Sequence, residues 1–269
     1  MTDISDLKTL LPSVIAAVEA AGRTLLARYS PEARPDDAIS LLDAIAANDA
    51  AVTSQLRAAL LAARPGSLWV EDEEEGGLLP DGEWWVADPA EGNVNHIHGR
   101  DGWGVTATLV RDGAPVLAVA VLPVTGAIYT AIRGGGAFLN GRPIHASRKI
   151  ELHASILGTG QARPGEDAET YTRIGRSVTT MLGGALLVRM SVPATLELVE
   201  VATGRIDGFW QHSQVRSGLA AGALLVAEAG GTVTDLQGRP WTFASADFLA
   251  AAPGIHADAV ACLAGETVA

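Results

Sequence analysis

Two acidic residues, Asp88 and Glu91, close a short apolar segment of the chain. They stand three positions apart, and a polar stretch follows them. Acids with this spacing at the end of a buried strand can converge on one hard cation, because carboxylate oxygens are ligands that Mg²⁺ and Ca²⁺ prefer. The surrounding residues are Trp84-Trp85-Val86-Ala87-Asp88-Pro89-Ala90-Glu91-Gly92-Asn93-Val94-Asn95-His96. The pattern predicts a cation site at the end of a strand.

The order Asp-Pro-x-acid-Gly-x-x-Asn at residues 88–95 closely resembles the signature loop of the inositol monophosphatase family. That loop is Asp-Pro-Ile-Asp-Gly-Thr-x-Asn-Phe, and the proteins that carry it are Mg²⁺-dependent phosphatases. Here Glu91, Asn93 and His96 replace the second Asp, the Thr and the Phe. The resemblance implies an α/β fold, a layered sandwich (αβαβα). It would be one domain over residues 1–269, with halves of about 1–150 and 151–269.

Three other segments also resemble the family pattern, so that the four together span nearly the whole chain. They are Ala47-Asn48-Asp49, Val70-Glu71-Asp72 and residues 219–231. The resemblance implies catalysis by four acids, of which Asp49 orients the attacking water. The implied metal ligands are Glu71, Asp88, Glu91 and the carbonyl of Ala90. The residues implied to face the substrate are Gly92, Asn93, His96 and Gln211.

Clustered carboxylates need cations for a physical reason. Acids held a few ångströms apart repel one another, and their pKa values rise unless positive charge neutralises them. Two Mg²⁺ ions about 3.5–4 Å apart also lower the pKa of a bound water and stabilise the leaving oxygen of an in-line displacement. Such a site would act on a small anionic substrate that carries phosphate or sulfate.

The chain departs from the family at positions that bear on this chemistry. The family's Trp-Asp pair, whose Asp binds the second metal, aligns with Ser217-Gly218. Glu91 lengthens another ligand by one methylene, whereas Mg²⁺ prefers tight octahedral geometry. Asn93 removes a hydroxyl that positions water, and Val192-Pro193 replaces a small turn before the substrate helix. We therefore expect one weak Mg²⁺ site and no organic cofactor.

The acids also have structural interpretations. Glu71 can belong to a solvated acidic loop, and Asp88 can cap the turn that follows it. Glu91 can favour a helix start through the helix dipole. Asp49 can cap a helix over residues 51–63. These alternatives compete with the site interpretation at every position.

Three functions are open on this evidence. The first is a Mg²⁺-dependent phosphatase with an altered second metal site and low activity on a small phosphomonoester. The second is a repurposed enzyme that expels phosphate or sulfate by intramolecular displacement or elimination, without activated water. The third is a catalytically silent subunit in a heteromeric complex or a homodimer, since family members commonly dimerise. An exposed apolar face of the central strands would then contact the partner.

Bulk properties narrow the class of protein. The chain has 269 residues, of which 48% are apolar, and this supports one large domain or two halves that share a core. A net charge of −12 argues against binding to a nucleic-acid backbone. No apolar run reaches the roughly 18 residues of a membrane span, and the N-terminus lacks the basic region of a signal peptide. A single cysteine, Cys262, excludes an intrachain disulfide and fits a reduced, cytoplasmic setting.

The spacing of apolar residues predicts the elements that must hold the site. Helices over 7–29 and 51–63 are expected to pack on one sheet, with Glu71, Asp88 and Glu91 at one mouth. Strands of the first half are predicted at 68–70, 84–87, 105–110, 116–122 and 127–132, the last three as an antiparallel meander. Helices of the second half are predicted at 167–180, 194–203, 219–229 and 256–264. Its strands are predicted at 156–157, 186–188, 207–210, 232–235 and 248–252.

Overall fold

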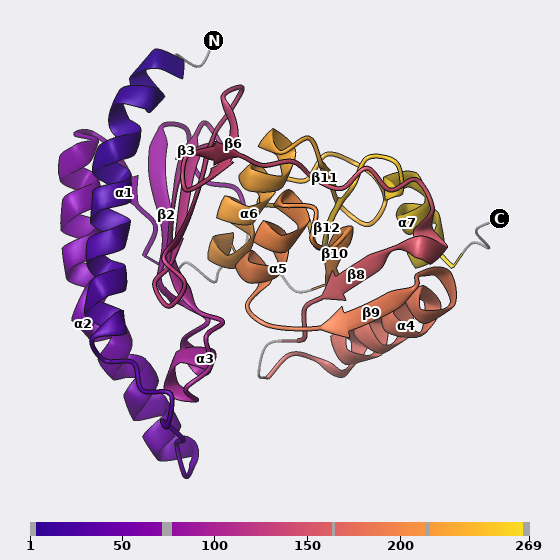
Figure 1. The fold of residues 1–269 in the computed structure, drawn as a ribbon, viewed down its shortest axis with the longest axis horizontal. Coiled ribbons are helices and arrows are strands. Elements are labelled where there is room, and N and C mark those ends of the chain that lie inside the picture. The colour runs from indigo at the N-terminus through magenta and orange to yellow at the C-terminus, as the bar shows by residue number, and fades with distance from the viewer. Residues whose placement is uncertain (1–3, 72–76, 163–164, 213–215, 266–269) are drawn as a thin grey trace.

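The structure is a computed structural model that describes residues 4–71, 77–162, 165–212 and 216–265. It consists of two β-sheets and three helical layers, stacked in the order αβαβα (Figure 1). One pair of helices covers the outer face of the first sheet, a second pair lies between the sheets, and a third covers the outer face of the second sheet. The predicted layered sandwich is confirmed.

The first sheet contains seven strands in the order β1-β2-β3-β4-β5-β6-β7. Only β1 and β2 are parallel, and every later pair is antiparallel, so the predicted meander is confirmed. The strands are β1 (Leu68–Trp69), β2 (Glu83–Glu91), β3 (Gly104–Arg111), β4 (Ala114–Leu122), β5 (Ala127–Ile132), β6 (Gly136–Leu139) and β7 (Arg142–Pro143).

The central strands of this sheet are buried on both faces, which corrects one expectation. In β3 and β4 all but the end residues are buried, because helices pack on each side of the sheet. The meander therefore offers no exposed apolar face to a partner. The helices on both sides also explain why the sequence of these strands is almost continuously apolar, since neither face of the strands meets water.

The outer helices are α1 (Ile4–Leu26) and α2 (Ala38–Ala63), and α2 begins much earlier than predicted. Asp37 caps α2 by accepting a hydrogen bond from the Ser40 amide, while the Ser40 side chain accepts one from the Asp37 amide. This capping box satisfies amide groups that a helix start leaves unpaired. The interpretation of Asp49 as a helix cap is consequently wrong: Asp49 lies in the middle of α2.

Among the described helices, α1 has the length and apolar composition that would suit a membrane span. Its apolar side chains nevertheless belong to the core, where Leu7, Val14 and Val18 are fully buried. The helix packs on α2, β3 and β4. We therefore interpret α1 as a core helix.

The second half forms a five-stranded sheet in the order β11-β12-β10-β8-β9. Strands β9, β8 and β10 are parallel, and β12 is antiparallel to both of its neighbours. The strands are β8 (Ile156–Thr159), β9 (Leu187–Met190), β10 (Gly208–Gln211), β11 (Thr232–Thr234) and β12 (Phe248–Ala251). The helices are α4 (Ala168–Gly184), α5 (Ala194–Ala202), α6 (Arg216–Glu228) and α7 (His256–Leu263). Helices α5 and α6 form the central layer, and α4 and α7 form the outer one.

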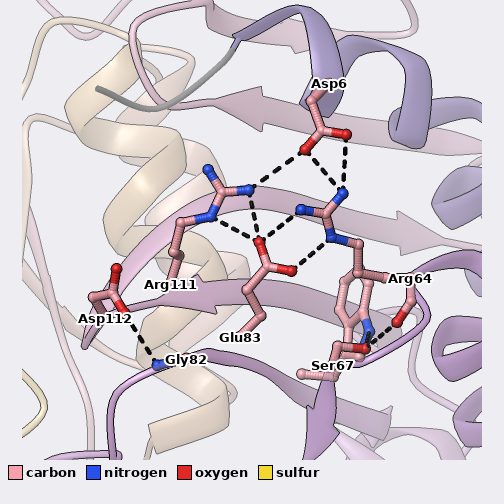
Figure 2. Close-up of polar contacts among 8 residues, drawn as sticks. Asp6, Arg64, Ser67, Gly82, Glu83, Arg111 and Asp112 are labelled. Carbon is pink, nitrogen blue, oxygen red and sulfur yellow. Dashed lines mark hydrogen bonds and ion pairs between the residues drawn. The ribbon is translucent and has the colours of Figure 1, made fainter.

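A network of ion pairs joins α1, α2, β2 and β3 at the start of β2, away from the acids at its other end (Figure 2). Glu83 accepts hydrogen bonds from Arg64 at 2.6 and 2.9 Å and from Arg111 at 2.7 Å. Arg64 also donates to Asp6 at 2.9 Å. The two guanidinium groups hold the pKa of the Glu83 carboxyl below its usual range. Four segments of the first half are thus fixed by two acids and two bases.

We expect Glu83→Gln to lower the free energy of unfolding by about 2 kcal/mol at pH 7, because two partly buried guanidinium groups lose their counter-charge. The pKa of Glu83 is lowered in the folded state, so its contribution is present above the unfolded pKa of about 4.3 and is lost as pH falls through the folded value. The difference between wild type and variant should therefore shrink below about pH 4. Urea unfolding at several pH values measures it. The pair of Arg57 and Glu71 provides a control, because both side chains are exposed and Glu71→Gln should cost less than about 1 kcal/mol.

Candidate active site

A β-bulge at the end of β2 brings Asp88 and Glu91 together. Asp88 lies opposite Thr106 of β3 and Glu91 opposite Gly104, so β2 advances three residues where β3 advances two. Side chains three residues apart in a regular strand point to opposite faces of the sheet. The extra residue of the bulge shifts this alternation by one, so that the two side chains point to the same face. The two carboxyl groups consequently lie on one side and share a hydrogen bond. The Ala90 amide donates to Asp88 at 2.9 Å and fixes the turn.

Glu91 is a buried acid that contacts both halves of the protein. Its Oε2 lies 3.0 Å from the hydroxyl of Thr195, which also lies 2.9 Å from the carbonyl oxygen of Gly218. The Thr195 hydroxyl carries one hydrogen, so its donation is divided between these two acceptors. Burial, followed by the charge of Asp88, raises the pKa of Glu91 well above its usual range.

Gly92 ends the acidic segment in a conformation that favours glycine. Its φ is +75°, and a Cβ would lie 2.7 Å from the Gly102 carbonyl oxygen and 3.0 Å from the ring of Pro193. The short helix α3 (Asn93–Ile97) follows directly. Within it, the Asn95 amide donates to Gly102 at 2.6 Å and to Val192 at 2.9 Å. The loop that carries the acids is thus tied to the segment before α5.

Asn48 orients the polar side chains of this loop from the outer helical layer. Its Oδ1 accepts from Arg28 at 2.9 Å, and since arginine only donates, the Asn48 NH₂ must point the other way. That group donates to Asn93 at 2.8 Å and lies 3.0 Å from Nδ1 of His96. Asn93 then donates both of its amide hydrogens, to Asp49 at 3.1 Å and to the Ile45 carbonyl at 3.3 Å. No amide hydrogen of Asn93 is left for water or substrate.

His96 is held in one neutral tautomer. Its Nε2 lies 3.0 Å from the Leu25 carbonyl oxygen, which can only accept, and its Nδ1 faces the donating amide of Asn48. Nε2 therefore carries the hydrogen. Burial lowers the pKa of His96, and the charge of Arg28 lowers it further. The side chain is 5% exposed and both ring nitrogens are occupied, so in this arrangement it anchors the loop and presents no ring nitrogen to a substrate.

The structure does not bring Glu71 to the other acids. Glu71 pairs through both oxygens with Arg57 of α2, at 2.6 and 3.0 Å, and its side chain is 71% exposed. The rest of the predicted acidic loop, residues 72–76, lies outside the described residues. Among the described residues, no three Asp, Glu, His or Cys side chains form a group that could hold a metal ion. The expected convergence of Glu71, Asp88 and Glu91 is thus absent, because a cationic helix residue pairs with Glu71 instead.

Gln211 ends β10 and is buried. Its side chain lies over Gly160, where a Cβ would collide with the Gln211 amide oxygen. Residues 213–215, which connect it to α6, lie outside the described part of the chain. Its role beside a substrate stays a prediction.

The sequence interpretation missed two residues that the structure places in the site, Asn48 and Thr195. A signal for Asn48 was available, because it stands four residues before Val52 and eight before Leu56 on the buried stripe of α2. A polar residue on such a stripe must find hydrogen-bond partners. Thr195 gave no comparable signal, since its partner Glu91 lies 104 positions earlier.

Comparisons with known proteins identify the family. The model of the inositol monophosphatase family matches residues 6–269, so the chain belongs to this family. It is 38% identical over 186 residues to the inositol-1-monophosphatase of Rhizobium meliloti (strain 1021). The aligned residues cover 68% of each of the two chains. The chain is also 38% identical over 173 residues to the Nus factor SuhB of Pseudomonas aeruginosa, covering 61% of this chain and 63% of that protein.

A solved structure agrees with this assignment. The inositol monophosphatase from Anabaena (Nostoc) sp. PCC 7120 superposes with a TM-score of 0.81 at 26% identity, over 98% of both chains. Members of the family generally depend on Mg²⁺ and act on phosphate esters.

Oxygen donors at the Asp88 loop are of a type that fits Mg²⁺. Asp88, Glu91 and the Ala90 carbonyl offer oxygen atoms of the type that Mg²⁺ binds, and the ion keeps several waters in most protein sites. The contact between the two acids marks a place where positive charge is needed, because burial and the charge of Asp88 raise the pKa of Glu91. Among the described residues, no group of three acids, histidines or cysteines forms around this pair: Gly218 has no side chain, and Glu71 is paired with Arg57.

We expect the pKa of the His96 imidazole to lie below its ordinary value of about 6.5, with the hydrogen of the neutral ring on Nε2. Its folded pKa is lowered, so the unfolded chain binds the proton first as pH falls, and the stability from the neutral ring is lost below the unfolded value of about 6.5. Two-dimensional ¹⁵N NMR of the imidazoles, assigned with His96→Gln, reports tautomer and titration. A ring that protonates above pH 6.5, or carries its hydrogen on Nδ1, would contradict the geometry.

Proposed function

We propose that this protein is a slow phosphatase that binds a small phosphomonoester and one Mg²⁺ at the Asp88 loop. The observation that carries the proposal is the contact between the buried carboxyl group of Glu91 and the half-buried carboxyl group of Asp88. Two touching acids form an unfavourable arrangement without a proton or a cation between them. Membership of a family that acts on phosphate esters supports the choice of substrate.

The chain's own residues would divide the work as follows. Asp88, Glu91 and the Ala90 carbonyl hold the cation, which when bound supplies positive charge and lowers the pKa of a bound water. Asp49 keeps a carboxylate beside the loop and orients the attacking water. Asn93 positions Asp49 by donating to it at 3.1 Å. Gly92 allows the backbone of the loop to approach the Gly102 carbonyl oxygen, which a Cβ at position 92 would prevent.

The same contacts explain why hydrolysis would be slow. Asn93 donates both amide hydrogens to protein oxygens, so it cannot orient a water as a hydroxyl could. A single cation supplies less positive charge to the phosphoryl group than a pair about 3.5–4 Å apart. Positioning and charge are the main requirements of phosphoryl transfer, and both are weakened here.

We expect turnover of inositol 1-phosphate or 4-nitrophenyl phosphate below about 1 s⁻¹ with Mg²⁺, under the typical enzyme range of about 1–10³ s⁻¹. Calorimetry should show one Mg²⁺ per chain, with weak affinity. Asp88→Asn should abolish both the turnover and the binding, whereas Glu228→Gln, which alters an acid bound to the amides of residues 134 and 136, should leave both unchanged. Turnover within the typical range, or two tight Mg²⁺ sites, would contradict the proposal.

A second role, as a subunit of an assembly, is supported by the exposed edge of the second sheet. Strand β9 pairs only with β8 in the described part of the chain. Four exposed apolar side chains lie on this strand or within two residues of its ends, and they are here called the β9 edge: Leu186, Leu187, Met190 and Val192. An exposed edge strand with apolar side chains can pair with another chain, because its backbone hydrogen-bonding groups are unpaired. That relatives are named Nus factors is consistent with a partner role.

We propose a second copy of this chain as the partner of the β9 edge. The cavity beside Val192, of about 610 Å³, is lined by both bases and acids, among them Arg100, Arg189 and Glu200. Mixed charge suits a two-fold interface, because the axis brings the bases of one copy to the acids of the other. Antiparallel pairing of two β9 strands would satisfy the free edge of each sheet.

We expect the protein to form a dimer of about twice 27.7 kDa in solution. Met190→Lys places a charge on the β9 edge, where Met190 is 52% exposed, and should convert the dimer to monomer. Ile39→Lys is the matched control, since Ile39 is 72% exposed on α2, far along the chain from that edge, and should leave the dimer intact. Light scattering after size exclusion measures the mass. A wild-type monomer would contradict the dimer and favour a heteromeric assembly.

A further inference from the structure

Thr195 occupies a fully buried place between the two halves of the active site. Its side chain is 0% exposed, in the first turn of α5. The hydroxyl contacts two oxygen atoms, Oε2 of Glu91 at 3.0 Å and the carbonyl oxygen of Gly218 at 2.9 Å. These atoms come from the end of β2 and from the first turn of α6. One hydroxyl thus links three elements at the acid pair.

Both atoms that Thr195 contacts are oxygens of the kind that coordinate Mg²⁺. Glu91 offers two carboxylate oxygens, and the Thr195 hydroxyl donates a hydrogen bond to one of them. Gly218 has no side chain, so the only oxygen atom that it offers is its carbonyl oxygen. The Thr195 hydroxyl donates a hydrogen bond to that oxygen as well. The hydroxyl therefore competes with a cation for both oxygens.

We propose that the Thr195 hydroxyl replaces a second cation in this site. It is a positioning residue: it holds Glu91 Oε2 and closes the space next to residue 218, so that one Mg²⁺ binds at the Asp88–Glu91 pair and no other binds beside it. The inference rests on the proposed function for the first cation. It implies that restoring a carboxylate at position 218 is not sufficient to create a second site while Thr195 is present.

The test measures Mg²⁺ binding at pH 8, where protons compete least for the carboxylates. The variants are Thr195→Ala, Gly218→Asp, the double variant and Thr195→Ser, which keeps the hydroxyl. Calorimetry gives the number of ions and the dissociation constants, and the rise in melting temperature with Mg²⁺ gives a second readout that does not depend on turnover. Far-UV circular dichroism checks that each variant is folded.

We expect one ion for the wild type and for Thr195→Ser, with equal affinity. Gly218→Asp should change the affinity less than threefold and add no ion. Thr195→Ala should strengthen the single site at least threefold by freeing Glu91. The double variant should bind two Mg²⁺ ions. Its gain in total Mg²⁺ affinity over the wild type should exceed the product of the gains of the two single variants at least tenfold, which corresponds to a coupling of about 1.4 kcal/mol.

Three outcomes would overturn the inference. Gly218→Asp could bind two ions with Thr195 in place. Thr195→Ala could leave the Mg²⁺ affinity unchanged or lower it. The change in Mg²⁺ affinity of the double variant could equal the product of the changes in the two single variants. Should the double variant fail to fold, the comparison of Thr195→Ala with Thr195→Ser decides alone. Failure of the proposed function is distinct, because it would appear as no Mg²⁺ binding and no hydrolysis in the wild type, whatever the variants do.

Discussion

Two carboxyl groups that touch inside a protein repel one another unless a proton or a cation lies between them. The bulge at the end of β2 forces Asp88 and Glu91 into this position, and the remainder of the site accommodates it. The Thr195 hydroxyl stabilises the pair from within the chain by donating to Glu91. The same need for positive charge is the reason for proposing a cation site at this pair, since Mg²⁺ binds carboxylate oxygens.

The acid pair also lies where the two halves meet, so its geometry depends on how they pack. Thr195 reaches Glu91 from α5, and Asn95 of α3 reaches the Val192 carbonyl in the opposite direction. Gly92 lets the chain pass close to Pro193. Each contact crosses from the first half to the second, and a shift of α5 would alter the acids as well as the interface.

The outer helices fix the loop from its other side. Asn48 of α2 joins Arg28, Asn93 and His96, and the Leu25 carbonyl binds the same imidazole. At the opposite end of β2, Glu83 and its two arginines connect these helices to the sheet (Figure 2). Strand β2 is therefore anchored to the helical layer at both ends, by neutral amides near the acids and by charges at the start.

The sequence by itself determined the layered fold, the meander and the position of the acid pair, because apolar periodicity and the Asp88 motif are local patterns. It could not determine which partners each side chain meets. Only the tertiary structure directs Glu71 to Arg57, buries His96 between Asn48 and Leu25, and places Thr195 against Glu91. These contacts join residues between 14 and 104 positions apart, and they follow from the packing of helices on sheets, which no local pattern of residues specifies.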